Sequence, residues 1–252
     1  MNDFSNQIHF SLQGKGGVGK SVVASILSQY IKEFENDVAV LDTDPVNNTL
    51  FEFKGLNPRY IQTLEEKDGE MVINPERFDL LMGVIIEDQN PAVLDIGASN
   101  YVVMKNYLLS NRIFDILSEN GKKVFFHVPI VGGQSFLSCL KELEEISKFP
   151  NAEIVVWANQ YFGDLCSESG DVYTDSKPYK AAKKHIIGTV EIERKAMHSK
   201  DTNNMLSDNL TFNEALAVND NPVRYGIINK SRLKSVKESI WKQLDAIFLP
   251  VE

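Results

Sequence analysis

Cysteine is scarce in this chain of 252 residues, which holds only Cys139 and Cys166. Two thiols are too few for a disulfide framework or a four-thiolate metal site, so we expect both to be reduced and do not favour zinc or iron–sulfur chemistry. No apolar run approaches the ~20 residues that span a bilayer, and the first five residues lack the basic-then-apolar order of a signal peptide. These absences predict a soluble, cytoplasmic protein.

Positive charge is in short supply over most of the chain. Residues 1–175 hold 13 Lys and Arg against 26 Asp and Glu, a net charge of −13. Residues 176–252 hold 13 basic and 9 acidic side chains, a net charge of +4, so that the two parts sum to the overall −9. The last third is therefore the only segment whose charge suits a polyanion or an acidic partner.

Short apolar runs alternate with helical patterns along the chain. Such continuous runs are typical of strands buried on both faces of a parallel sheet. Because no repeat, low-complexity tract or long linker interrupts the alternation, we expect one α/β domain over residues 1–252, with a doubly wound, mostly parallel sheet and helices on both faces. The expected strands cover residues 8–12, 38–41, 92–96, 124–128, 154–157 and 186–190, and the least regular segments are 45–73, 160–176 and 199–211.

Two helices can be placed from side-chain spacing alone. The first carries Val23, Leu27, Tyr30, Ile31 and Phe34 on one face. The second follows Asn74, an expected N-cap, and begins with proline at position 75.

A glycine-rich segment follows the first expected strand and precedes the first expected helix. It reads Gly14-Lys15-Gly16-Gly17-Val18-Gly19-Lys20-Ser21 and fits the pattern G-x-x-x-x-G-K-[ST]. Glycines let backbone N–H groups turn around a β-phosphate without interference from a Cβ, and the helix N-terminus adds its positive dipole end. Lys20 supplies charge to the β- and γ-phosphates, and the Ser21 hydroxyl suits Mg²⁺. The alternative is a turn that only packs a helix on the sheet.

Lys15 is a second lysine in this loop. The run Lys-Gly-Gly-Val-Gly-Lys-Ser resembles the deviant Walker A motif of the ParA/MinD family of dimerising P-loop ATPases. In that family the first lysine crosses a two-fold interface to the partner's nucleotide, so the resemblance implies this role for Lys15. A solvated lysine beside the phosphates is the alternative.

Two aspartates end the second expected strand, where carboxylates would face the phosphate loop. The run Asp42-Thr43-Asp44-Pro45 looks like the Asp-x-Asp-Pro box of the same family, although Val46 replaces the usual glutamine. The resemblance implies that Asp44 orients or activates the attacking water and that Asp42 supports the Mg²⁺ shell. A turn-capping role is the alternative for either residue.

Asp95 ends a third apolar strand, followed by Ile96 and Gly97, in the form of a Walker B element. The resemblance implies that Asp95 holds Mg²⁺ through water. Family members often continue Asp-x-Pro-x-Gly, and the departure here weakens the case for γ-phosphate sensing by the following loop. A surface aspartate at a strand end is the alternative.

Asn159, at the end of the strand expected at 154–157, matches the adenine-contacting residue of the family, since its amide can pair with the N6 and N7 edge of the base. Guanine-specific relatives follow this asparagine with Lys-x-Asp, which this chain lacks. The resemblance therefore favours ATP over GTP.

Further stretches resemble one branch of the family, the TraL-type nucleotide-binding proteins of conjugative plasmids: Gln13, residues 128–134 and residues 211–215. The implied function is a Mg²⁺-dependent ATPase, switched by its nucleotide between monomer and homodimer, in plasmid conjugation, partition or positioning. Lys20, Lys15, backbone amides and Mg²⁺ would stabilise the transferred phosphoryl group while Asp44 positions the water.

Two other enzyme classes share this scaffold. An ATP-dependent biosynthetic ligase or amide synthase would need a second substrate pocket over the γ-phosphate, and we find no Arg or His cluster to form one. A nitrogenase-reductase-like redox protein needs two cysteines in loops beside a dimer axis, and Cys139 falls within an expected helix.

The basic final third leaves the partner open. Partition ATPases of the family hold DNA through C-terminal lysines and arginines, but the net charge of −9 opposes binding of a polyanion. We therefore favour a solvated helix face over DNA, with a protein of the transfer or partition machinery as the expected partner. An apolar stripe from Leu233 to Phe248 indicates a last helix packed on the sheet, in preference to one lying on a membrane. The basic residues concerned are Lys177, Lys180, Lys183, Lys184, Arg232, Lys234 and Lys237.

Overall fold

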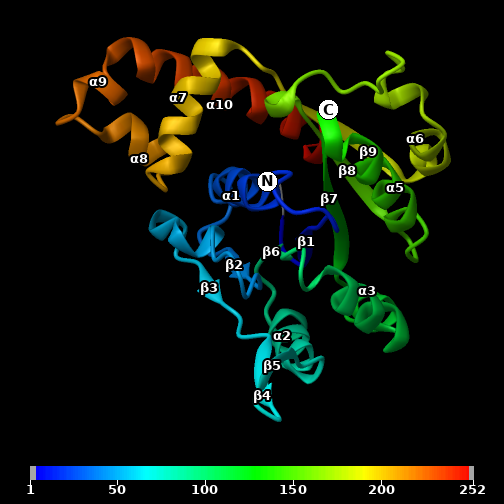
Figure 1. Cartoon of the computed structure of the whole chain (residues 1–252). Coiled ribbons are helices and arrows are strands. Elements are labelled where there is room, and N and C mark those ends of the chain that lie inside the picture. Colours follow the sequence, from blue (N-terminus) through cyan, green and yellow to red (C-terminus); the bar gives the residue numbers. More distant parts are fainter. Residues whose placement is uncertain (1–3, 250–252) are drawn as a thin grey trace.

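A seven-stranded parallel sheet forms the centre of the molecule. The computed structural model describes residues 4–249, apart from the side chains of residues 196 and 197. The strand order is β3-β2-β6-β1-β7-β8-β9, and each neighbouring pair runs parallel (Figure 1). The strands are β1 (Gln7–Ser11), β2 (Ala39–Asp42), β3 (Arg59–Tyr60), β6 (Ala92–Asp95), β7 (Lys123–Val131), β8 (Glu153–Asn159) and β9 (Ile186–Ile192).

Helices cover both faces of this sheet, because apolar residues of the central strands point alternately to either side. In β8, Val155 and Trp157 join the core on one face, while Ile154 and Val156 join the core on the other. On the first face pack α1 (Lys20–Ile31), α7 (Ala196–Ser207), α8 (Phe212–Ala217) and α10 (Ile227–Phe248), with the short α9 (Pro222–Tyr225) beside them. On the second face pack α2 (Glu76–Glu87), α3 (Tyr101–Ser110), α4 (Ile113–Glu119), α5 (Phe136–Ile146) and α6 (Lys177–Ala182). The doubly wound α/β fold expected from the sequence is confirmed.

All six expected strands are present, shifted at their ends by up to three residues. Helix α1 buries Val23, Leu27, Tyr30 and Ile31, but it ends three residues before Phe34. Helix α2 begins at residue 76, one residue later than expected, and the Asn74 side chain accepts a hydrogen bond of 2.8 Å from the backbone N–H of that residue.

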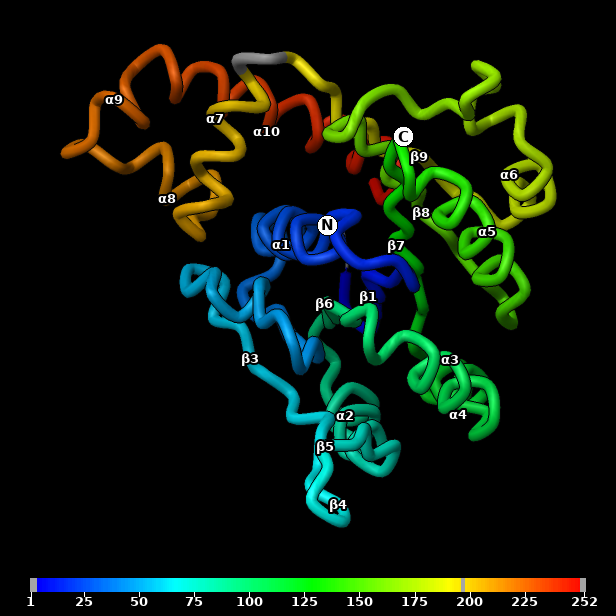
Figure 2. Tube along the Cα trace, viewed as in Figure 1, coloured from blue at the N-terminus to red at the C-terminus, as the bar shows by residue number. Residues whose placement is uncertain are grey.

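The expectation that residues 45–73, 160–176 and 199–211 are the least regular segments was partly wrong. Residues 199–211 lie mostly in α7, whose buried residues include the charged Asp201 and therefore give a weak apolar pattern. Within 45–73 the chain forms the short helices η1 (Leu50–Glu52) and η2 (Lys54–Leu56), then β3 and the hairpin β4 (Leu64–Lys67) and β5 (Glu70–Ile73). Asp68 and Gly69 turn this hairpin with φ angles of 55° and 84°, so the Asp-Gly dipeptide was a readable signal. Figure 2 shows the hairpin projecting beside α2, away from α7–α10.

The apolar stripe of α10 is covered by the protein itself. Leu233, Ile240 and Leu244 are buried, and the helix packs against β9, α7 and α8. Packing, the interpretation favoured from the sequence, accounts for the stripe. Across residues 4–249, none of the helices has the length and hydropathy needed to cross a bilayer.

Helix α10 also reaches the last strand of the sheet. The Gln243 side-chain oxygen accepts a hydrogen bond of 2.7 Å from the backbone N–H of Glu191, and its amide N–H donates to the Glu191 carbonyl at 3.2 Å. One side chain therefore occupies both backbone groups of a β9 residue on the side away from β8.

Two histidines are buried at the centre of the sheet. The Trp157 indole N–H donates to His127 Nδ1 at 3.0 Å, and His127 Nε2 lies 3.0 Å from His9 Nδ1. His127 must therefore carry its proton on Nε2 and donate it to His9, whose own Nε2 has no hydrogen-bond partner among residues 4–249. Burial lowers the pKa of His9 to about 3 and that of His127 well below its usual value.

These histidines predict a loss of stability in acid. Both histidines stay neutral in the folded chain, but in the unfolded chain they become protonated below pH ~6.5. Between that pH and the pKa of each histidine in the folded chain, each one therefore lowers the free energy of unfolding by up to about 1.4 kcal/mol per pH unit as the pH falls. His9→Phe should remove one of these contributions. Urea unfolding between pH 7 and pH 5 should show that the free energy of unfolding falls less steeply with pH for the variant than for the wild type.

The half-buried His185 supplies the control, because its substitution to Phe removes a histidine from outside this network. An equal pH response for His9→Phe and the wild type would contradict the assignment of neutral buried histidines.

Candidate functional site

The phosphate-loop sequence lies between β1 and α1, at the carboxyl edge of the sheet. Gly17 and Gly19 adopt φ angles of 75° and 98°, a left-handed conformation that favours glycine. The Ser11 hydroxyl at the end of β1 donates to the Lys20 carbonyl at 2.8 Å and so ties the strand to the first turn of the helix. The loop thereby presents the backbone N–H groups of a helix N-terminus toward the carboxyl edge of the sheet.

The two lysines of the loop differ in their surroundings. Lys20 is buried, and its ammonium donates to the Lys15 carbonyl at 3.2 Å. Burial lowers its pKa, and the carboxylates of Asp95 and Asp44 oppose that shift. Lys15 is exposed at the surface of the loop. The Lys20 ammonium therefore lies beneath the loop, whereas the Lys15 side chain extends from its surface.

Asp42 and Asp95 lie side by side, because β2 and β6 pair in parallel with these two residues in register. Burial raises the pKa of Asp42 to about 6, although backbone N–H groups of Asp44 and Phe51 donate to it at 2.9 and 3.0 Å. Burial raises the pKa of Asp95 to about 7, an effect that the nearby Ser21 hydroxyl opposes. Within residues 4–249 no donor reaches either Asp95 oxygen with standard hydrogen-bond geometry.

This donor set fits a hard cation. Buried carboxylate oxygens without full hydrogen bonding, beside the Ser21 hydroxyl, are ligands of the kind that Mg²⁺ prefers. In the described part of the chain no group of three or more His, Cys, Asp or Glu side chains could hold a metal by itself. A Mg²⁺ ion held by one or two side chains commonly takes its remaining ligands from phosphates and water.

Asp44 follows the end of β2 and packs against the loop after β6. Its Oδ1 accepts hydrogen bonds from the backbone N–H groups of Val46 and Asn47 at 2.9 and 3.1 Å, so it does cap a turn. A Cβ on Gly97 would lie 2.5 Å from the Asp44 Cγ and 2.8 Å from its Cα. The glycine after the expected Walker B strand is therefore required for close approach of Asp44.

Asn159 ends β8 next to the phosphate loop. Its amide N–H donates to the Val18 carbonyl at 3.4 Å, and its side-chain oxygen accepts from the Tyr161 backbone N–H at 3.1 Å. A Cβ on Gly19 would lie 3.1 Å from this amide nitrogen. The side chain thus bridges the end of the strand and the loop.

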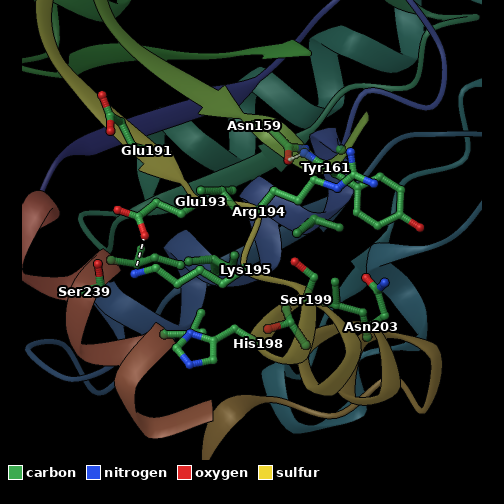
Figure 3. Close-up of a pocket in the computed structure, with 18 of the residues that line it drawn as sticks. Asn159, Tyr161, Glu191, Glu193, Arg194, Lys195, His198, Ser199, Asn203 and Ser239 are labelled. Carbon is green, nitrogen blue, oxygen red and sulfur yellow. Dashed lines mark hydrogen bonds and ion pairs between the residues drawn. The ribbon is translucent and has the colours of Figure 1, made fainter. Parts of the chain in front are cut away.

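A cavity of about 390 Å³ opens beside Asn159 (Figure 3). It runs from Gly17 and Gly19 to a wall formed by α7 and α10, and the segment after β9 forms one side. A salt bridge of 2.5 Å joins Lys195 and Glu193 there. Sequence reasoning did not find the α7 and α10 wall, although small polar residues spaced by three or four on each helix were a signal. These residues are Ser199, Thr202, Asn203, Ser235 and Ser239.

Exposed apolar side chains lie in segments that follow the carboxyl ends of the central strands, as the loop of Lys15 does. The most exposed are Val46, after β2, and Leu137, in the first turn of α5, at 71% and 70%. The others are Val102 in the first turn of α3 and the pair Tyr161 and Phe162 after β8. All five follow the carboxyl ends of strands, so they share the face of the molecule that carries the loop.

Within the described residues, six of the 13 Lys and Arg side chains of the final third pair with a carboxylate. Lys180 lies 3.6 Å from Asp175 and Lys237 lies 2.6 Å from Glu33. These ion pairs agree with the solvated, structural role favoured from the sequence. Further pairs are Lys195–Glu193, Arg224–Asp208, Arg232–Asp201 and Lys234–Glu238.

Comparison with known families covers almost the whole chain. Residues 10–246 match CbiA, the CobQ/CobB/MinD/ParA nucleotide binding domain. The chain belongs to this nucleotide-binding family. Two curated relatives are each named protein TraL of Escherichia coli: one is 36% identical over 244 residues, covering 95% of this chain and 98% of the relative, and the other is 34% identical over 243 residues, covering 95% and 97%.

Solved structures include a MinC:MinD cell division protein complex of Aquifex aeolicus. That MinD-type chain is 14% identical, with a TM-score of 0.49 and 98% of both chains covered. Membership of the CobQ/CobB/MinD/ParA family identifies the chain as a nucleotide-binding protein.

The close contact between Gly97 and Asp44 predicts that adding one methyl group at position 97 destabilises the fold. Gly97→Ala should lower the free energy of unfolding by about 1–3 kcal/mol, because the new Cβ overlaps the backbone of Asp44. Gly83→Ala is the matched control: apart from its chain neighbours and the backbone of α2 itself, no described atom lies within 4 Å of a Cβ there, and alanine in the interior of α2 should raise stability by about 0.5–1 kcal/mol. Chemical denaturation of both variants decides the matter. Equal effects would show that Asp44 does not need the glycine.

Proposed function

We propose that this protein is a Mg²⁺-dependent ATPase whose bound nucleotide switches it between a monomer and a face-to-face homodimer in plasmid conjugation, partition or positioning. The observation that supports this most is the buried pair Asp42 and Asp95 beneath a glycine-rich loop that carries two lysines of opposite exposure. Extensive identity to proteins named TraL supports the link to plasmids.

The chemistry would be transfer of the γ-phosphoryl group to water. The amides of residues 14–21 and the Lys20 ammonium bind the phosphates, while Asp44 orients the attacking water. Ser21 and Asp95 would hold Mg²⁺, with Asp42 supporting them. When bound, the ion neutralises charge on the β- and γ-phosphates.

The dimer would form through the loop face. The side chains that offer apolar surface at the same edge of the sheet as Lys15 are Val46, Val102, Leu137, Tyr161 and Phe162. A two-fold axis would bring each such patch against the same patch of a second copy and carry Lys15 to the partner's nucleotide. We expect a protein of the transfer or partition machinery to bind the dimer. We do not favour DNA, because the net charge of −9 opposes binding of a polyanion.

Substitution of Asp44 tests hydrolysis and dimerisation together. Asp44→Ala and Asp44→Asn should both trap an ATP-bound dimer, because water loses its partner while the phosphate contacts remain. Asp44→Asn also keeps an oxygen that can accept from Val46 and Asn47. Light scattering with Mg²⁺ and ATP should show doubled mass for both variants and a monomer without nucleotide. A monomer under every condition would contradict the switch and would favour a ligase.

The two lysines should separate binding from assembly. Lys20→Ala should abolish ATP binding, because it removes the buried charge beneath the loop. Lys15→Ala should leave ATP binding measurable but eliminate dimerisation and reduce hydrolysis by about 10³-fold or more, the range of a phosphate-stabilising residue supplied by a partner. Equilibrium titration and phosphate release measure the two effects. Normal hydrolysis by Lys15→Ala would refute the cross-interface role.

A further inference from the structure

Three strongly exposed apolar side chains lie together where α9 turns into α10. Val223, Ile227 and Ile228 are 86%, 84% and 63% exposed. Helix α9 packs against α10 through a tight turn at Gly226, where a Cβ would lie 2.5 Å from the Pro222 carbonyl oxygen. A cluster of exposed apolar side chains, unlike a single one, marks an interaction surface. These three residues are called the tip below.

The segment that carries the tip is anchored by its inward-facing side chains. Arg224 forms a salt bridge of 2.9 Å with Asp208, and Tyr225 is buried. The Asn229 amide N–H donates to the Asp201 carboxylate at 2.8 Å. Because these contacts fix the turn on both sides, the apolar side chains of the tip are held in solvent by an ordered structure.

Positive charge follows the tip along α10. Residues 222–237 hold five Lys and Arg and no Asp or Glu. Lys230 and Lys234 lie three and seven residues after Ile227, on the same face of the helix. Lys230 forms no salt bridge with a described residue, and Lys234 pairs only with the exposed Glu238 at 3.7 Å. The tip therefore suits an apolar surface that is surrounded by unpaired carboxylates.

Helix α2 offers such an apolar surface. It turns one face to the core, while Leu80 and Val84, one turn apart on the other side, are 66% and 47% exposed. Gly83 lies beside them, and apart from its chain neighbours and the backbone of α2 no described atom lies within 4 Å of the Cβ that it lacks. A residue without a side chain lets another molecule approach the helix closely. Leu80, Gly83 and Val84 are called the α2 patch below.

Acidic side chains surround the α2 patch. Residues 64–88, which form the β4–β5 hairpin and α2, hold eight Asp and Glu against two Lys and Arg. Glu76 and Glu87 lie on the same face of α2 as Leu80 and Val84, one toward each end. None of the eight carboxylates forms a salt bridge with a residue that the structure describes. The α2 patch therefore matches the tip in apolar character and opposes it in charge.

The two surfaces lie at separate borders of the molecule. Figure 2 shows α9 at one border and the β4–β5 hairpin, beside α2, at another. One copy cannot bring its own tip to its own α2 patch, but the tip of one copy can reach the α2 patch of a second. Complementary charge around an apolar centre is the usual arrangement of a specific protein contact.

We propose that the tip of one copy of this chain binds the α2 patch of a second copy, so that copies associate end to end. The apolar side chains cover one another, and the lysines that follow the tip meet the carboxylates around the α2 patch. Because the contact joins two different surfaces, each added copy leaves one of each free, and association continues beyond a dimer. The contact uses neither a nucleotide nor the residues around Lys15, so it is independent of the proposed face-to-face homodimer.

Few apolar side chains take part, so we expect a weak contact, in the class of interfaces below ~1,200 Å². At about 1 µM the chain should be a monomer without nucleotide, as the proposed switch requires, and association should appear near about 100 µM.

The test is sedimentation velocity of the full chain without nucleotide, from about 1 µM to about 500 µM. The weight-average mass of the wild type should rise with concentration to more than that of a dimer. The rise should shrink between about 50 mM and about 500 mM salt, because salt screens exposed charges. Leu80→Asp and Ile227→Asp each alter one surface and should each remain monomeric. Val172→Asp adds the same charge at an exposed valine outside both surfaces and should associate like the wild type.

An equimolar mixture of the two variants shows which surfaces meet. Leu80→Asp keeps an intact tip, and Ile227→Asp keeps an intact α2 patch. The mixture should therefore form a heterodimer of doubled mass that cannot grow, because the two surfaces left over both carry the substitution. Thermal unfolding checks that each variant is folded, and Leu80→Ser and Ile227→Ser replace any aspartate variant that is not.

Three outcomes would overturn the inference. The first is a wild type that stays monomeric at every concentration. The second is association that persists in Leu80→Asp or in Ile227→Asp, because other surfaces would then hold the copies together. The third is a mixture that stays monomeric, because the tip would then not bind the α2 patch. None of these outcomes bears on the ATP-dependent homodimer, which is measured at about 1 µM with Mg²⁺ and ATP.

Discussion

The rest of this structure depends on one constraint, which is that two buried carboxylates are held next to each other. Burial raises the pKa of both Asp42 and Asp95, and the Asp42 carboxylate raises the pKa of Asp95 further. The Lys20 ammonium lowers the pKa of Asp95, and the carboxylates of Asp95 and Asp44 oppose the lowering of the Lys20 pKa by burial. Three features bring the two carboxylates and the Lys20 ammonium together: the phosphate loop, the pairing of β2 with β6, and the glycine at position 97. Buried carboxylates are stabilised most when a cation binds to them and phosphate oxygens supply the other ligands of that cation.

The sequence predicted the parts of this fold in which local pattern and tertiary packing agree. All six buried apolar strands formed, as did α1, because central parallel strands and an amphipathic helix have distinct periods. The Gly14–Ser21 loop could be found for a similar reason, since its glycines meet a conformational demand at Gly17 and Gly19. Parallel topology then brings Asp42 and Asp95 to the same edge as that loop.

The parts that could not be predicted depend on contacts distant in sequence. Helix α7 buries Asp201 against Arg232 of α10, so its inward face looks polar until the partner helix is known. The cavity wall combines residues of α1, α7 and α10, which are distant in sequence, so the pattern on each helix does not show that they share one cavity. The bonding of Asn159 is of the same kind: its position was correct, but Val18 and Tyr161 determine what its amide can reach.

The contact of Gln243 with Glu191 has a consequence for assembly. The outermost strand of an open sheet is a template onto which another chain can add a strand, and repeated addition leads to fibres. Gln243 fills that position with an amide from the protein's own last helix, and at the other border β3 is only two residues long. Both borders therefore discourage open-ended growth of the sheet by addition of strands from other chains.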